Sequence, residues 1–269
     1  LARRDRLAAG WLAYEAAPAF DPAMRVRPGW RGPLAWFAVG RRVPARPPSL
    51  ARGRLPNVLR WTPRPGAAAF RAAVAAIREW IAAGRVYQVN LTARWSAHLP
   101  RLSVNRWAAA LIAAQPRSYS ALIETPQWAV VSVSPELFVQ LNGRRIECRP
   151  MKGTRPRAPD AAGDHARGAE LAASAKDRAE NVMILDMVRN DLGRIARHGS
   201  VRVTRLWTVE RHPTVWQMTS TAVADSDAPL VEILRALFPA ASITGAPKIE
   251  AMRVIAELER APRGVGALW

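Results

Sequence analysis

The segment QWAVVSVSPELFVQLNGRRIECRP, residues 127–150, constrains the fold of this chain more than any other stretch. Two runs rich in β-branched and other apolar residues flank the dipeptide Asn142-Gly143, which favours the two-residue turn of a β-hairpin. A turn centred on this dipeptide places Glu136 opposite Arg149 across the two strands. The sequence therefore predicts an antiparallel hairpin whose open end holds a carboxyl group.

Segments with helical periodicity separate this hairpin from other strand-like stretches. Ser174 and Asp177 resemble an N-terminal capping box, and Pro247 suits the first turn of a last helix. Hairpins mixed with separate helices predict an α+β fold. The expected helices lie within 67–84, 105–115, 174–199 and 247–258, and the other expected strands within 85–95 and 200–210.

The region before residue 67 differs in composition from the rest. It is rich in Trp, Pro and Arg, and its short apolar runs predict strands and turns. We therefore divide the chain into a partial N-terminal subregion, residues 1–66, and a main region, residues 67–269, which contains the motifs described below.

The chain has a formal net charge of +19, which is compatible with binding nucleic acid or small anionic substrates. Its arginines are spread along the chain rather than clustered, so we expect no nucleic-acid partner. It has no apolar run of about eighteen residues, so we expect no membrane span. The single Cys148 rules out an internal disulfide and fits a reducing cytoplasm, where we expect the protein to reside.

Lysine is rare in this chain. Only Lys152, Lys176 and Lys248 are present, which leaves 37 arginines among the 40 cations. Unlike arginine, a lysine amine can lose its proton when it is desolvated or lies near other cations, and it can then attack carbon.

Lys152 is the lysine with the most reactive surroundings in the sequence. Three arginines, at 149, 155 and 157, lie close along the chain, and neighbouring cations favour the neutral amine. The hairpin predicted above places Glu136 at the same end, where its carboxyl could give a proton to a leaving group. We therefore expect Lys152 to be a nucleophile; the alternative is a surface lysine in a loop.

Glu180 follows Lys176 by one helical turn. Such a pair is usually a solvated surface contact that contributes little to stability. The alternative is that Glu180 points inward as an oxygen ligand for Mg²⁺, which binds to carboxylates and waters.

SITGAPK, residues 242–248, is a turn of small residues that leads into a helix. Free backbone N–H groups and the helix dipole favour a bound carboxylate or phosphate at such a place. Thr244 adds a hydroxyl and Lys248 a charge. The alternative is an ordinary capped helix.

Together these segments resemble the chorismate-utilising enzymes. Their order and spacing fit that family from about residue 67 onward. Within the family, lysine at position 152 is typical of aminodeoxychorismate synthases, whereas anthranilate synthases typically have alanine there. The resemblance rests on YQVNLT (87–92), SPELF (134–138), RPMKGTRPR (149–157), KDRAENVMILDMVRNDLGR (176–194), GSVRV (199–203) and SITGAPK (242–248).

The resemblance implies a chorismate-binding-enzyme fold, with antiparallel sheets packed against helices, and conversion of chorismate and ammonia to 4-amino-4-deoxychorismate. It implies that Lys152 attacks ring carbon C2 while the C4 hydroxyl leaves, with Glu136 as general acid. Ammonia then adds at C4 and expels the lysine. A separate glutamine amidotransferase subunit is the expected source of ammonia.

Other roles follow from the same resemblance. Glu180 matches a ligand of a Mg²⁺ cofactor, which favours the second interpretation of that residue. The turn that holds a substrate carboxylate matches Thr244, Gly245 and Ala246, and Lys248 belongs to the same motif.

Two features depart from the family pattern. Many relatives have a histidine in the site where this chain has Gln217, which can form hydrogen bonds but cannot shuttle a proton. The family pattern also continues past residue 269, so we expect an incomplete chain that lacks further Mg²⁺ carboxylates and has little activity alone. Two other interpretations stay open: an anthranilate synthase component I, and a non-catalytic basic remnant of the family.

Overall fold

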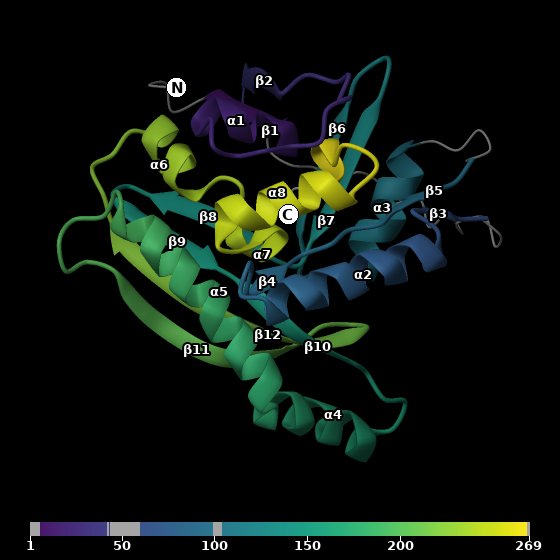
Figure 1. The fold of residues 1–269 in the computed structure, drawn as a ribbon. Helices are drawn as coiled ribbons and strands as arrows, with labels where there is room; N and C mark the ends of the chain where they lie inside the picture. The colour runs from purple at the N-terminus through teal and green to yellow at the C-terminus, as the bar shows by residue number, and fades with distance from the viewer. Residues whose placement is uncertain (1–5, 42, 44–59, 99–103, 268–269) are drawn as a thin grey trace.

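The computed structural model describes residues 6–41, 43, 60–98 and 104–267 (Figure 1). The helices are α1 (Ala17–Phe20), α2 (Ala67–Ala82), α3 (Val104–Ala114), α4 (Ala161–Ala173), α5 (Ala175–Gly193), α6 (Leu230–Leu237), α7 (Ala241–Thr244) and α8 (Lys248–Leu258), with 3-10 turns η1 (Tyr14–Ala16) and η2 (Gly264–Ala267). The strands are β1 (Arg6–Leu12), β2 (Ala35–Arg41), β3 (Thr62–Arg64), β4 (Gln88–Val89), β5 (Arg94–Ser96), β6 (Tyr119–Glu124), β7 (Ala129–Ser134), β8 (Leu137–Asn142), β9 (Arg145–Arg149), β10 (Met151–Pro156), β11 (Arg202–Arg211), β12 (Val215–Asp225) and β13 (Gly245–Ala246).

Strands β8 to β12 form the largest sheet. The long strand β12 pairs with β11 along one edge and with β9 and then β10 along the other, and β8 covers the outer edge of β9. Every strand pair in the described ranges is antiparallel, and the helices are separate elements around the sheets. This arrangement confirms the predicted α+β class.

The predicted hairpin of β8 and β9 is confirmed, but its register differs. The turn is centred on Gly143-Arg144 rather than on Asn142-Gly143, and the glycine has φ 59°, which suits the first central position of a type II′ turn. A register shift within β8 then sets Leu137, not Glu136, opposite Arg149. The predicted facing pair is therefore wrong, because both the turn and the bulge displace the register.

Helix α5 covers one face of the large sheet and is the expected long helix of 174–199, although it ends at Gly193. The Ser174 hydroxyl accepts a hydrogen bond from the backbone N–H of Asp177 at 3.2 Å, so the predicted cap is confirmed. The apolar face contains Ile184, Leu185, Val188 and Leu192, which pack against Ile146, Cys148, Ala222 and Ala224 of the sheet.

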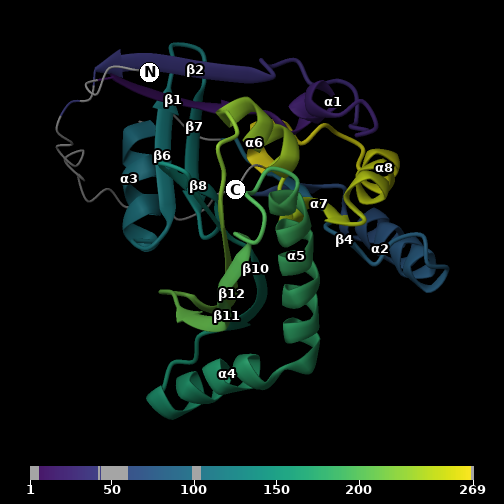
Figure 2. The same cartoon turned by 90° about the vertical axis from the view of Figure 1, so that its left-hand side faces the viewer.

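Helix α4, which the sequence analysis did not anticipate, begins at a cap formed by Asp160, whose carboxylate accepts the N–H of Gly163 at 2.7 Å. Figure 2 shows α5 alongside β10 and β12, with α4 turned away across its N-terminal end. Together the two helices brace the strand on which Lys152 lies. Within the described ranges, no helix combines the length and the apolar character needed to cross a membrane.

Residues on both sides of the proposed division at residue 66 share one core. Tyr14 and Met24 pack with Phe238 and Met252. The carboxylate of Glu15 accepts the backbone N–H groups of residues 263 and 264 at 2.7 and 2.8 Å. Residues 44–59 of the N-terminal subregion lie outside the described residues, and the division itself stays a prediction.

Candidate active site

Lys152 lies in an irregular part of β10. The pairing with β12 shifts register between Met151 and Thr154, and Gly153 has φ 100°, a conformation that favours glycine. The bulge turns the Lys152 side chain toward α7, where its Nζ donates a hydrogen bond to the carbonyl oxygen of Ser242 at 2.9 Å. The amine is therefore held by a neutral acceptor rather than by a carboxylate.

Partial burial shifts the acid–base equilibrium of this amine toward its neutral form. Desolvation lowers the pKa of Lys152, and the nearby carboxyl groups of Glu136 and Glu180 oppose this by raising it. A neutral amine can still donate to Ser242 while its lone pair stays available to attack carbon. The structure thus brings Lys152 and Glu136 to one place, as the sequence predicted.

The predicted cause of the lowered pKa of Lys152 is wrong. We expected the arginines at 149, 155 and 157 to favour it by repulsion, but each guanidinium is neutralised by carboxylates. The arginines do not act on Lys152, and desolvation replaces them as the cause. The pairs are Arg149 with Glu210, Arg155 with Glu170 and Asp177, and Arg157 with Asp164.

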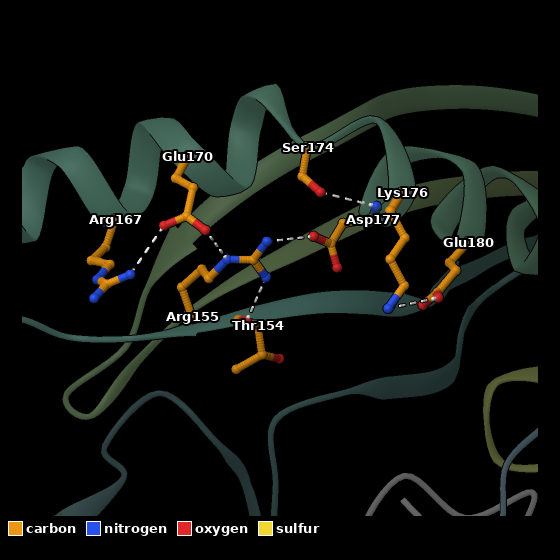
Figure 3. Close-up of polar contacts among 8 residues, drawn as sticks. All are labelled: Thr154, Arg155, Arg167, Glu170, Ser174, Lys176, Asp177 and Glu180. Carbon is orange, nitrogen blue, oxygen red and sulfur yellow. Dashed lines mark hydrogen bonds and ion pairs between the residues drawn. The ribbon is translucent and has the colours of Figure 1, made fainter. Parts of the chain in front are cut away.

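Figure 3 shows how Arg155 ties β10 to both neighbouring helices. Its Nε donates to Glu170 on α4 at 2.9 Å, and one terminal nitrogen donates to Asp177 on α5 at 2.9 Å. The other terminal nitrogen donates to the carbonyl oxygen of Thr154 at 3.0 Å. This arginine therefore fixes the strand just past Lys152 against the α4–α5 junction.

Glu136 lies in the connection between β7 and β8, and its carboxyl group is deeply buried. Burial raises the pKa of Glu136 from 4.5 to about 7, while Ser242, Lys152 and the backbone of Met151 oppose the rise. A carboxyl group with such a pKa is protonated in a substantial fraction at neutral pH. It can therefore act as a general acid beside the Lys152 amine.

Glu180 lies on α5, and its side chain is 39% exposed. Its carboxylate is 3.8 Å from the Nζ of Lys176, the surface pair that the simpler interpretation predicted (Figure 3). Such a pair is weak, so the carboxylate can exchange it for a metal ligand at little cost.

Among the described residues, few other metal-ligating side chains surround Glu180. In the described part of the chain, no group of three or more His, Cys, Asp or Glu residues could hold a metal. The Glu180 carboxylate raises the pKa of Lys152, so it lies near that amine. Mg²⁺ commonly binds through one or two carboxylates together with substrate oxygens and waters. Glu180 fits one carboxylate ligand of such an ion.

The turn 242–248 is more buried than predicted. The Thr244 hydroxyl donates to the carbonyl oxygens of Ala240 and Ala241 at 3.1 and 3.2 Å, so it closes α7. Gly245 and Ala246 form β13, which pairs with β4. A Cβ on Gly245 would lie 2.1 Å from the carbonyl oxygen of Gln88, so only glycine permits this approach.

Lys248 begins α8, and its side chain contacts α5. Its Nζ donates to Asp191 on α5 at 2.6 Å and to the carbonyl oxygen of Leu237 at 3.3 Å. The side chains of this ion pair are only 10% and 12% exposed. The pair therefore joins α5 to the start of α8, behind the turn that supplies the Ser242 carbonyl.

Gln217 lies on β12 and is buried, and its Oε1 has no hydrogen-bond partner among the described residues. It lines a pocket with about 440 Å³ of open space, together with Pro135 and His212. Burial lowers the pKa of His212. The pocket thus reaches the residue that precedes Glu136.

Sequence reasoning missed two contributors to the site. Ser242 acts through its carbonyl oxygen, which no side-chain pattern reveals, and Asn181 lies beneath β10 on α5. Both residues are within the motifs quoted above, but motif membership gave no reason to single them out.

Comparison with known proteins identifies the fold. Residues 2–267 match the model of the chorismate binding enzyme family. The structure of anthranilate synthase component I from Streptococcus pneumoniae TIGR4 superposes with a TM-score of 0.81 at 24% identity, covering 99% of this chain and 68% of that chain. A putative 2,3-dihydroxybenzoate-specific isochorismate synthase from Bacillus anthracis gives 0.71 at 18% identity, covering 97% and 77%.

Curated relatives are more similar in sequence. Aminodeoxychorismate synthase component 1 of Escherichia coli (strain K12) is 45% identical over 187 residues, which cover 68% of this chain and 41% of the relative. That of Bacillus subtilis (strain 168) is 40% identical over 200 residues, covering 73% and 42%. Anthranilate synthase component 1 of Streptomyces coelicolor is 43% identical over 215 residues, covering 77% and 42%. The chain spans about two fifths of the length of these relatives, and it belongs to the chorismate binding enzyme family.

Proposed function

We propose that this chain forms the lysine-bearing side of the chorismate site in an aminodeoxychorismate synthase component I. The substrates are chorismate and ammonia, and the product is 4-amino-4-deoxychorismate. Relatives of that name at 40–46% identity support the assignment. The observation that carries it is the half-buried Lys152 amine, which donates to the Ser242 carbonyl oxygen and has a lowered pKa beside the Glu136 carboxyl group.

Lys152 is the nucleophile of the first step. Its neutral nitrogen forms a bond to ring carbon C2 as the C–O bond at C4 breaks, and the Glu136 carboxyl gives its proton so that the hydroxyl leaves as water. Ammonia then adds at C4, and the bond from C2 to Lys152 breaks. The Glu136 carboxylate takes up the proton that the added ammonia releases, which restores the starting state. Arginine could fill this space but could not form the carbon–nitrogen bond.

Glu180 would hold a Mg²⁺ ion at the edge of the site, and the ion would neutralise substrate carboxylate charge. Thr244, Gly245 and Ala246 would present backbone to a substrate carboxylate, with Lys248 fixing that turn through Asp191. Gln217 would donate a hydrogen bond into the pocket that it lines. Ammonia would come from a glutamine amidotransferase subunit.

Incubation of the protein with chorismate, Mg²⁺ and ammonium tests the proposal. Because this chain forms only one side of the site, we expect aminodeoxychorismate to form slowly, and we expect both Lys152→Ala and Lys152→Arg to abolish it. Equal product from Lys152→Arg would refute the nucleophile, because guanidinium cannot take that role.

Anthranilate synthase component I is the second candidate, and the relative from Streptomyces coelicolor supports it. In that case the same incubation would release anthranilate and pyruvate without a separate lyase. A non-catalytic basic remnant would instead bind DNA with strong salt dependence and leave chorismate unchanged. The three outcomes differ in their products, so one assay separates them.

A further inference from the structure

Asn181 lies on α5 directly beneath the strand on which Lys152 lies, and it is only 1% exposed. Its Nδ2 donates to the carbonyl oxygen of Met218 on β12 at 3.2 Å and to that of Lys152 on β10 at 3.5 Å. Its Oδ1 accepts the hydroxyl of Ser220 at 2.5 Å. Because both neighbours of Nδ2 are hydrogen-bond acceptors, these contacts fix the orientation of the Asn181 side-chain amide.

Ser220 extends this network to a third strand. It is fully buried, and its hydroxyl accepts the backbone N–H of Trp207 on β11 at 3.1 Å. Trp207 has φ 52°, which is a strained conformation for a large side chain. Such strain persists only where surrounding contacts determine it, and the Ser220 hydroxyl is one of them.

The backbone at Lys152 needs this support, because regular strand pairing does not supply it. In the register of β10 with β12, Met151 and Thr154 have partners but Lys152 and Gly153 lie in the shifted stretch between them. Gly153 adds a backbone conformation that many side chains could not hold. The Asn181 amide is therefore the contact that ties the Lys152 peptide group to α5.

We propose that Asn181, held in place by Ser220, is a positioning residue that directs the Lys152 side chain toward Glu136 and the Ser242 carbonyl. Asn181 touches no reacting atom and acts only through the backbone of Lys152. The inference rests on the proposed function for its consequence in catalysis. The geometric part can be tested without any turnover.

The scarcity of lysine provides that test. Protein labelled with ¹³C at lysine Cε should give signals from only Lys152, Lys176 and Lys248, assigned by replacing each lysine in turn. We expect Asn181→Leu and Ser220→Ala to move the Lys152 signal toward that of exposed Lys176 and to leave the other two unchanged. Ser220→Ala is the smaller change, and it tests the positioning role if Asn181→Leu does not fold.

A matched control distinguishes a specific effect on the position of Lys152 from a general loss of stability. Ser226 is also buried, and its hydroxyl donates to the carbonyl oxygen of Ile195 at 2.6 Å, beyond the end of β12. Ser226→Ala should destabilise the fold without moving the Lys152 signal. The proposal is overturned if the Lys152 signal stays unchanged in the folded Asn181 and Ser220 variants, or if all three signals move together in them.

The kinetic consequence distinguishes this inference from the proposed function. In Asn181→Leu, kcat should fall by about tenfold or more while KM stays within about twofold, because misplacement affects the reacting nitrogen rather than substrate binding. If the unaltered protein makes no product and Lys152 gains no chorismate adduct, the proposed function is refuted, and the lysine signals still decide the role of Asn181. An unchanged kcat beside a moved Lys152 signal would refute the catalytic consequence.

Discussion

Replacing Glu136 with glutamine should change the pH dependence of folding. The pKa of this carboxyl rises from 4.5 to about 7 because it is buried. Between these values the folded state keeps a proton that the unfolded state has lost, so stability falls as pH rises through this window. The interval is roughly 2.5 pH units, which corresponds to about 3 kcal/mol at about 1.36 kcal/mol per unit.

Urea unfolding at pH 4.5 and pH 8 measures this effect. We expect the free energy of unfolding of Glu136→Gln to decrease much less between pH 4.5 and pH 8 than that of the parent, because the amide stays neutral over the whole range. Glu147→Gln on β9 is a matched control that removes another partly buried carboxyl while leaving Glu136 in place. An identical pH dependence in the parent and in Glu136→Gln would refute the assigned burial and with it the general acid.

Three further substitutions test the surroundings of the site. Lys248→Met should cost about 3–5 kcal/mol in urea unfolding because it leaves Asp191 buried without its cation, and adding Asp191→Leu should recover most of the loss. Gly245→Ala should cost about 1–3 kcal/mol and speed hydrogen exchange in β4, since the new Cβ meets the carbonyl oxygen of Gln88; unchanged exchange would contradict the pairing. Arg155→Lys should cost about 1 kcal/mol in thermal unfolding, because lysine cannot keep both carboxylate contacts, and an unaltered midpoint would argue against this bridge.

Local patterns in the sequence predicted the helices α2, α3, α5 and α8 and the β8–β9 hairpin. The β8–β9 hairpin and the capped start of α5 follow from Asn142-Gly143 and Ser174, whose chemistry acts on adjacent residues. The exact register was not predictable, because a bulge in β8 depends on how the whole sheet packs. Apolar Val182 on α5 is 37% exposed, whereas the neighbouring polar Asn181 is only 1% exposed, so residue polarity alone does not identify the inward face of this helix.

The site was predictable where it depends on residues that are close in the sequence. The rarity of lysine pointed to Lys152, and the hairpin brought Glu136 near it. The source of the lowered pKa was not predictable, because nearby arginines in the sequence find carboxylates that are distant in sequence, such as Glu210 for Arg149. For the same reason the sequence did not reveal that Lys248 pairs with Asp191, which lies 57 residues away.

The mass of the peptide that contains Lys152 tests the central claim most directly. The protein is incubated with chorismate and Mg²⁺ but without ammonium, quenched and digested. The account predicts that Lys152 gains the mass of one chorismate less one water, and that Lys152→Ala shows no such adduct. Formation of aminodeoxychorismate on adding ammonium, at an undiminished rate in Lys152→Ala, would contradict the account.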